Sequence, residues 1–315
     1  MKTSLTTFEN QIHDWLLDLL YSQWRVLGVP FSTSQPQHPD EIIDPDALLW
    51  CSLEFFSSEP RLCEQVVSWL ASNDQSLLRP RIRKFARAKP DPRASIWHVL
   101  DPQWKSDVEK PACPCYRQKS LDELVGFCRD LTNKLQTTVT LRQHPGTRQR
   151  TPATVLLRAR DTLGADARHF LLVYLLANPG GAKLRSVADW SGQSYRNISK
   201  AASRWEAARI ISIEHGYSRL RSPAPWAAIL ELESAHISLL DWVRLYDAPI
   251  LLLRTLDKVR TAQIPADSPV VAAIVREITA EVEACVESDL SARSQTVQDL
   301  KNLLVSGQAA IRPVR

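Results

Sequence analysis

Glycine is scarce in this chain, and nucleotide-binding loops depend on it. Only 9 of the 315 residues are glycine, and neither GxGxxG nor GxxxxGKS or GxxxxGKT occurs. Such loops use glycine where the backbone must approach a phosphate closely. The scarcity excludes the commonest nucleotide-binding folds, although other classes of enzyme stay open.

Short catalytic motifs are missing as well. The sequence contains no GxSxG, no HExxH and no HxE followed by PCxxC. No motif therefore groups a nucleophile with a base and an orienting acid. We expect neither catalytic residues nor a bound cofactor, with an enzyme of unrecognised active site as one alternative.

Two groups of residues resemble metal ligands in type alone. They are His38, Asp40, Glu41, Asp44 and Asp46 in HPDEIIDPD, and Cys113 with Cys115 in ACPC. Helix capping and acidic residues in a first helical turn explain the first group, because such residues interact favourably with the helix dipole. The second group lacks the further CxxC or His pair of a zinc site. We expect no metal site.

Long hydrophobic runs are also missing. No apolar stretch approaches the roughly 18 to 20 residues of a transmembrane helix, and residues 1–10 lack the basic start and apolar core of a signal peptide. The six cysteines are scattered, which is typical of reduced thiols rather than of a disulfide framework. We expect a protein of a bacterial-type cytoplasm with no membrane contact.

Positive charge is concentrated in one part of the chain. Residues 140–225 contain 14 Lys and Arg against 5 Asp and Glu, a balance of +9, whereas the remainder carries −5. Affinity for nucleic acid rises with the number of phosphates neutralised, so this concentration indicates a polyanion-binding surface. A solvated basic face is the alternative explanation.

Hydrophobic periodicity predicts a mostly α-helical fold. Residues 6–28 repeat apolar side chains at helical spacing, and Asp44-Pro45 and Ser268-Pro269 are typical of an N-cap followed by proline. After Ser268, one helix face is apolar and includes Val271, Ile274, Val275, Ile278, Val282 and Cys285. We expect this stripe to form a homodimer interface. Most of the ten tryptophans, including Trp15, Trp50, Trp69 and Trp242, occupy apolar helical positions and are expected in the core.

Residues 184–222 have the spacing of a helix-turn-helix. Ala188 falls where two helices would cross, Gly192 falls in the turn, and Ile198 and Ala201 fall at inward positions of the second helix. Two β-prone runs then flank His215-Gly216, which is typical of a hairpin turn. The order of helices and hairpin resembles the winged helix-turn-helix of MarR, ArsR and related bacterial regulators.

One position departs from that pattern. RWEAARII corresponds to the RLEERGLV-like segments that join the second helix to the wing in those families, and Arg209 stands where many members have glycine. Glycine allows a tight turn after a helix, so arginine at this position raises the question of how sharp this joint is. The resemblance implies a winged helix-turn-helix that binds double-stranded DNA, in a homodimeric transcriptional repressor. A winged helix used for protein interaction is the alternative.

Ten residues are predicted to contact DNA on this basis. The second helix would enter the major groove, where Arg contacts guanine and Asn contacts adenine. The wing would contact the neighbouring backbone or the minor groove. The predicted residues are Ser194, Tyr195, Arg196, Asn197, Lys200 and Arg204 in the helix, and His215, Tyr217, Arg219 and Arg221 in the wing.

Four parts follow from these patterns. They are an N-terminal helical domain (1–88) with some helix-turn-helix character, a connector with one helix and a basic loop (89–150), the winged helix-turn-helix (151–225) and a C-terminal helical domain for dimerisation or partner binding (226–315). Residues 43–86 also resemble a segment of bacterial helix-turn-helix proteins encoded beside nucleotidyltransferase toxins. That resemblance implies, as an alternative function, an antitoxin that neutralises a partner toxin and regulates its own operon.

Overall fold

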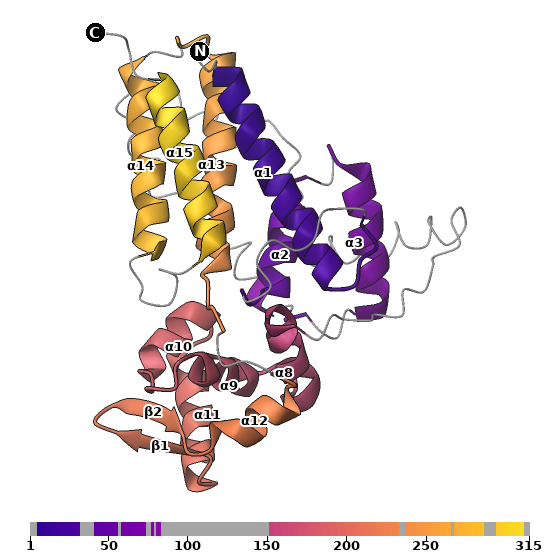
Figure 1. Ribbon diagram of the computed structural model, residues 1–315, viewed down its shortest axis with the longest axis vertical. Helices are drawn as coiled ribbons and strands as arrows, with labels where there is room; N and C mark the ends of the chain where they lie inside the picture. Colours follow the sequence, from indigo (N-terminus) through magenta and orange to yellow (C-terminus); the bar gives the residue numbers. More distant parts are fainter. Residues whose placement is uncertain are drawn as a thin grey trace. The chain divides into compact units, whose positions relative to one another are not determined.

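The fold of the described residues is mostly helical, as the sequence predicts. The computed structural model describes residues 5–31, 41–55, 58–73, 77–78, 80–82, 151–232, 237–265, 268–286 and 294–311. Within these ranges the sole sheet is a two-stranded antiparallel hairpin (Figure 1). The chain divides into two compact units, Met1–Leu48 with Pro145–Arg315, and Leu49–His144. No helix of the described ranges is long and apolar enough to cross a membrane.

Four long helices of the first unit pack as a bundle. They are α1 (Leu5–Val26), α13 (Trp242–Thr261), α14 (Pro269–Val286) and α15 (Gln295–Ile311). Both α1 and α14 contact α13 and α15, so the four helices close into a ring around one core (Figure 1). On α14, Val271 and Val275 are fully buried and Ile278 is nearly so. The stripe expected to form a homodimer interface is therefore core of the same chain, and it supplies no argument for a dimer.

Helix α1 forms where its apolar periodicity predicts it. Phe8, Ile12, Leu16 and Leu20 are fully buried at intervals of four residues. Trp15, expected in the core, lies at the edge of this stripe and is half-buried. The helix packs closely on α15, because a Cβ atom at Gly307 would overlap the ring of Phe8.

Acidic side chains of the HPDEIIDPD segment cap helices. Asp44 Oδ1 accepts hydrogen bonds from the backbone N–H groups of Asp46 (3.1 Å) and Ala47 (3.4 Å), at the start of α2 (Pro45–Ser52). Glu41 accepts from the Ser294 hydroxyl (2.7 Å) and from the backbone N–H of Thr296 (3.2 Å), at the start of α15. Capping accounts for both carboxylates without a metal. His38 and Asp40 lie outside the described residues, among which no cluster of three metal-ligand side chains occurs.

The second unit is described mainly by α3 (Pro60–Asn73). Pro60 occupies its first position, and Leu62, Val66 and Trp69 are buried. Cys63, on the same helix, is buried and is not part of a disulfide. The connector (89–150), with its expected helix, basic loop and Cys113-Cys115 pair, lies outside the described residues. Arg79, Arg83, Lys84 and Arg87, which precede the connector, also lie outside them.

Residues 151–232 form a small assembly, which we call the helix–hairpin unit. Its elements are a 3-10 turn η3 (Pro152–Thr154), α8 (Val155–Leu163), α9 (Ala167–Ala177), α10 (Leu184–Ser191), α11 (Tyr195–Ala207), β1 (Ile211–Glu214), β2 (Tyr217–Leu220) and α12 (Pro223–Ile229). Helix α9 is central, since it packs against α8, α10, α11 and β2. Most of its residues are therefore buried, and nearly all sides of the helix are apolar. The expected boundary at residue 225 falls inside α12, whose Trp226 stacks on Trp205 of α11 with ring centroids 5.8 Å apart.

Scarce glycine leaves some helix ends in a strained conformation. Helix α11 ends in a Schellman motif, in which the N–H of Arg209 bonds to Glu206 (2.9 Å) and that of Ile210 to Trp205 (2.8 Å). Arg209 has φ 58°, so it adopts the left-handed conformation that glycine normally supplies. The departure from the family pattern therefore leaves the sharp joint intact. Glu231 (φ 50°) and Gln263 (φ 54°) occupy equivalent positions after α12 and α13.

Arg209→Gly is therefore expected to stabilise the protein by up to about 1.5 kcal/mol. The left-handed conformation costs an L-residue about 1–2 kcal/mol, which exceeds the roughly 0.5–1 kcal/mol of extra chain entropy that glycine loses on folding. Urea denaturation of the full chain measures the change. Arg209→Ala, which keeps the Cβ atom, is the control, and equal stabilities of the two variants would contradict the explanation.

Candidate nucleic-acid-binding surface

A left-handed turn residue and a capping hydrogen bond determine where α11 begins. Gly192 ends α10 with φ 66°, in the left-handed conformation expected of the turn residue. Ser194 then caps α11, since its Oγ accepts a hydrogen bond from the backbone N–H of Asn197 (3.2 Å). Capping accounts for serine at this position, which was predicted to contact DNA. The hydroxyl is exposed but already has a structural role.

Helix α11 presents opposite chemistry on its two sides. The buried side carries Ile198, Ala201, Ala202 and Trp205. A helix turns by about 100° per residue, so the predicted residues Arg196, Asn197, Lys200 and Arg204 share one arc opposite that side, and all four are exposed. The only acidic residue of α11, Glu206, lies off this arc. Tyr195, also predicted, is 50% exposed at the first turn.

Positive charge at this end of α11 does not stabilise the helix. A helix N-terminus carries a partial positive charge, so cations in the first turns are locally unfavourable. Arg196 lies in the first turn of α11, which contains no acidic residue. Its presence is therefore unexplained by helix stability. Both the helix N-terminus and these cations would attract a phosphate group.

The hairpin forms around the predicted turn. Strands β1 and β2 pair from Ile211↔Leu220 to Glu214↔Tyr217, which leaves His215 and Gly216 as a two-residue loop. Both have positive φ, 53° and 80°, as a type I′ turn requires. Side chains alternate along β2, so the predicted residues Tyr217 and Arg219 are exposed whereas Ser218 and Leu220 are buried. His215 is exposed at the tip of the loop.

Residues 180–183 hold this hairpin in place. The backbone of Ala182 pairs with that of Ser218 through two hydrogen bonds of 2.9 and 2.8 Å. The Arg219 guanidinium donates to the Gly180 carbonyl from Nε (3.3 Å) and from an Nη atom (2.7 Å). Lys183 Nζ lies 5.5 Å from the centroid of the Tyr217 ring. The sequence does not predict this pairing, because a single paired residue produces no periodic pattern.

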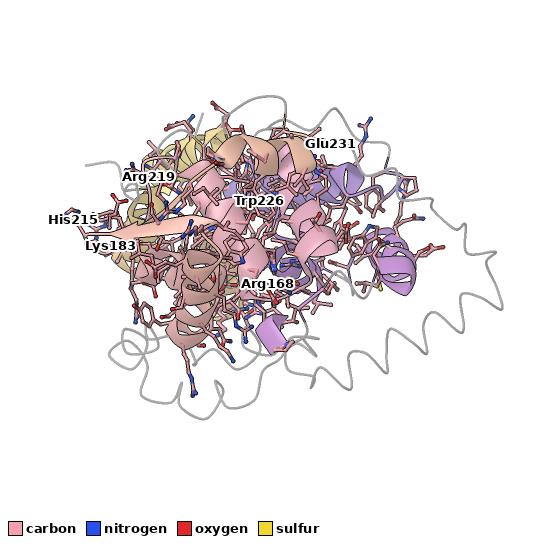
Figure 2. The ribbon with its side chains drawn as sticks, turned by 90° about the horizontal axis from the view of Figure 1, so that it is seen from below. Arg168, Lys183, His215, Arg219, Trp226 and Glu231 are labelled. Atoms are coloured by element: carbon pink, nitrogen blue, oxygen red, sulfur yellow. The ribbon has the colours of Figure 1, made fainter. Side chains whose placement is uncertain are left out.

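Three basic residues of the helix–hairpin unit are already paired with carboxylates or with backbone carbonyls and are half-buried or exposed. Arg168 pairs with Asp166 (2.7 Å), and Arg185 pairs with Asp189 (3.1 Å). Arg158 is half-buried and donates to the backbone carbonyls of Thr151, Leu230 and Glu231. The other exposed cations, which we call the basic surface, are Lys183, Arg196, Lys200, Arg204, Arg209, Arg219 and Arg221. Figure 2 shows Lys183, His215 and Arg219 on the hairpin side of the unit, away from Glu231.

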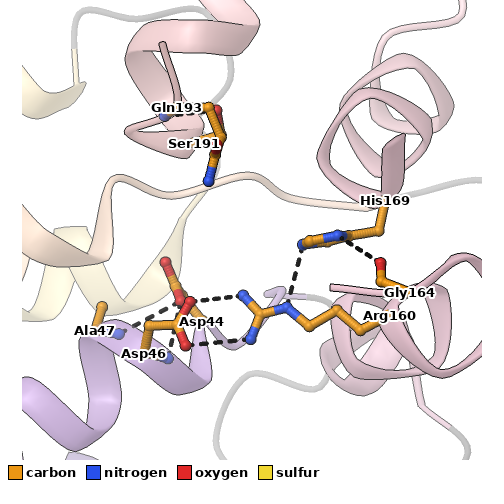
Figure 3. A network of polar contacts seen from close by, with 8 residues as sticks. All are labelled: Asp44, Asp46, Ala47, Arg160, Gly164, His169, Ser191 and Gln193. Carbon is orange, nitrogen blue, oxygen red and sulfur yellow. Dashed lines mark hydrogen bonds and ion pairs between the residues drawn. The ribbon is translucent and has the colours of Figure 1, made fainter. Parts of the chain in front are cut away.

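Arg160, another basic residue of the segment 140–225, is part of a buried polar network. Arg160 donates two hydrogen bonds to the Asp46 carboxylate (2.7 and 3.3 Å) and a third from Nε to His169 Nε2 (3.1 Å) (Figure 3). Because a guanidinium cannot accept a hydrogen bond, His169 Nε2 is the acceptor and its Nδ1–H donates to the Gly164 carbonyl (3.2 Å). At most 3% of Asp46, Arg160 or His169 is exposed. The charge of Arg160 is thus neutralised in the core and contributes no binding surface.

One tyrosine of the unit has a perturbed hydroxyl. Burial raises the pKa of Tyr174, and the nearby Asp189 carboxylate acts in the same direction, whereas a hydrogen bond with Ser186 lowers it. Tyr174 also contacts the ring of Trp190, with centroids 5.5 Å apart. A raised pKa favours the neutral form of the hydroxyl, as expected for a ring that packs against Trp190.

All ten predicted contact residues are exposed on the helix–hairpin unit. They come from two adjoining elements, α11 and the hairpin, which the Schellman joint at Arg209 connects. Arg221 donates to the Ile211 carbonyl from Nε (3.1 Å), so its guanidinium, like that of Arg219, already has a backbone contact. Comparison with models of protein families, with curated proteins and with solved structures gives no match. The functional argument therefore depends on this surface alone.

Proposed function

We propose that the helix–hairpin unit is a winged helix-turn-helix that binds double-stranded DNA, and that the chain is a transcriptional regulator acting as a repressor. The observation that carries the proposal is the exposed arc of Arg196, Asn197, Lys200 and Arg204, which contains no acidic residue and lies opposite the buried side of α11. The order of α9, α10, α11, β1 and β2 also supports it.

The dimensions of α11 suit the major groove. Its 13 residues span about 20 Å, and the major groove of B-DNA, about 12 Å wide, admits one α-helix. Arg196 and Asn197 lie at the N-terminal end of α11, where a recognition helix contacts base edges. Arg can bond to guanine O6 and N7, and Asn to adenine N6 and N7. Lys200 and Arg204 lie further along the arc, where they would contact further bases or phosphates.

Single-stranded nucleic acid is a less suitable ligand. Proteins that bind single strands stack successive bases on exposed aromatic rings along a basic groove. Among the described residues, the exposed large aromatic side chains are Tyr195 and Tyr217 alone. Tyr217 already carries the contact with Lys183. The described surface therefore has cations for a duplex backbone but few rings for base stacking.

The test begins with selection of preferred duplexes from a random pool by the full chain. Affinity for the selected duplex is expected to fall with salt, with a log–log slope of about −0.9 per phosphate contacted. Asn197→Ala is expected to cost about 1–3 kcal/mol on the selected duplex and much less on a scrambled one, because alanine cannot form the bidentate hydrogen bonds to a base.

Glu206→Ala is the matched control for this experiment. Glu206 is exposed on α11 but lies off the arc, so its replacement should leave the preference for the selected duplex unchanged. If Asn197→Ala and Glu206→Ala discriminate the two duplexes as the parent does, α11 does not recognise sequence. Affinity that does not respond to salt would contradict the proposal altogether.

A further inference from the structure

Arg219 has its guanidinium engaged with the protein backbone. Nε and one Nη atom of Arg219 both donate to the Gly180 carbonyl. This is one of the two edges of the guanidinium that can bind a phosphate in bidentate fashion. The contact joins β2 to the segment before α10, beside the Ala182–Ser218 pair. The geometry of Arg219 is that of a residue that positions the hairpin.

The approach of these two segments is close and leaves little freedom. Gly181 has φ 96°, which L side chains rarely adopt, and a Cβ atom there would lie 3.1 Å from the Ser218 carbonyl oxygen. The two Ala182–Ser218 hydrogen bonds depend on this approach. Gly181 therefore offers a way to loosen the hairpin without removing a charge.

Lys183 is an exposed cation at the same edge. Its ammonium group faces the Tyr217 ring at 5.5 Å, and Tyr217 is 47% exposed. Within the described ranges, Lys183 forms no ion pair with an acidic side chain. An ammonium group has three N–H donors, so a cation–π contact with one ring leaves donors for a further partner.

Lys183 is also an unfavourable residue for its local position. It is the N-cap of α10 and makes no side-chain capping hydrogen bond. N-caps favour Ser, Thr, Asp and Asn, and a cation at a helix N-terminus opposes the helix dipole. A residue that breaks a local rule in this way indicates a function outside the local structure.

We infer that Lys183 is a phosphate-contacting residue of the hairpin edge, and that Arg219 is a positioning residue that holds the hairpin against residues 180–183. The inference rests on the proposed DNA-binding function and assigns separate roles to two cations of its surface. Tyr217 holds the Lys183 ammonium on the exposed face of the hairpin. The contacts of Arg219 and Gly181 fix the position of the hairpin, and so of that face, relative to α11.

Salt titration of duplex binding by the full chain separates the two roles. Lys183→Ala is expected to reduce the magnitude of the log–log slope by about 0.9, the contribution of one phosphate. Arg219→Ala and Gly181→Ala are expected to weaken binding with the slope unchanged, because neither removes a phosphate contact. Arg219→Lys keeps the charge but cannot reproduce the two-point contact, so it should behave as Arg219→Ala does.

Amide hydrogen exchange without DNA provides the second measurement. Exchange of the Ala182 and Ser218 N–H groups should accelerate in Arg219→Ala and Gly181→Ala and stay at the parent rate in Lys183→Ala. The inference is overturned if Arg219→Ala lowers the slope while leaving exchange unchanged, or if Lys183→Ala leaves the slope unchanged. Failure of the parent chain to bind any duplex would defeat the proposed function, and exchange would then still decide the positioning role of Arg219.

Discussion

Replacing Arg196, Lys200 and Arg204 together by alanine is expected to lower the affinity for duplex DNA by about a hundredfold or more at physiological salt. Each phosphate that the variant no longer neutralises removes one increment of counterion release, about 0.9 in the log–log slope, and any base contact adds about 1–3 kcal/mol. All three side chains are exposed opposite the buried face of α11. Thermal stability should therefore stay close to that of the parent.

A second triple variant controls for net charge. Arg168, Arg185 and Arg244 are exposed cations paired with Asp166, Asp189 and Asp241 respectively, and they lie outside the arc of α11. Replacing these three by alanine changes the net charge equally but should reduce affinity far less. Fluorescence titrations of both variants over a range of salt concentrations make the comparison. Equal losses of affinity would indicate non-specific attraction by overall charge and would contradict a binding surface on α11.

Asp46→Leu is expected to destabilise the protein by about 3–5 kcal/mol, because it leaves the buried charge of Arg160 without its carboxylate. Asp46 is fully buried and Arg160 is 3% exposed, so water cannot solvate the unpaired guanidinium in the native structure. The expected change is a large share of the about 5–15 kcal/mol by which a domain is stable. Urea denaturation of the full chain measures it.

A double-mutant cycle measures how much of the stability depends on the interaction between Asp46 and Arg160 rather than on each residue separately. Asp46→Leu combined with Arg160→Met replaces both charges by apolar groups, so it should be less destabilising than Asp46→Leu alone. His169 Nε2 then has no Arg160 donor, which keeps the double variant below the parent in stability. Additive effects of the two single variants would mean that the 2.7 Å contact between them contributes no coupling.

Features set by a few neighbouring residues could be predicted from the sequence. Asp44 caps α2 before Pro45, Gly192 provides the left-handed turn before α11, and His215-Gly216 forms the hairpin loop. Each depends on backbone conformations and hydrogen bonds within about four residues, which residue type largely determines. Inward positions such as Ile198 were predictable for a similar reason, since helical periodicity identifies the apolar face.

The roles of charged residues could not be predicted in the same way. The charge count of residues 140–225 includes Arg160, Arg196 and Arg219 with equal weight. In the structure, Arg160 lies in the core, Arg196 is exposed, and Arg219 bonds to the Gly180 backbone. A charge count cannot separate these environments, because each depends on what the rest of the chain places around the side chain.

Local propensity and periodicity are enough to predict the helices, the hairpin and the side of each helix that must be buried. Which segment covers each buried side depends on the packing of the whole chain. The stripe of α14 is packed by its own chain instead of by a second copy, and Ala182 pairs with Ser218, which is distant in the sequence. The physical reason is that hydrophobic burial is non-directional. A periodic pattern therefore shows that a face is removed from water but does not identify its partner, which depends on how the whole chain packs.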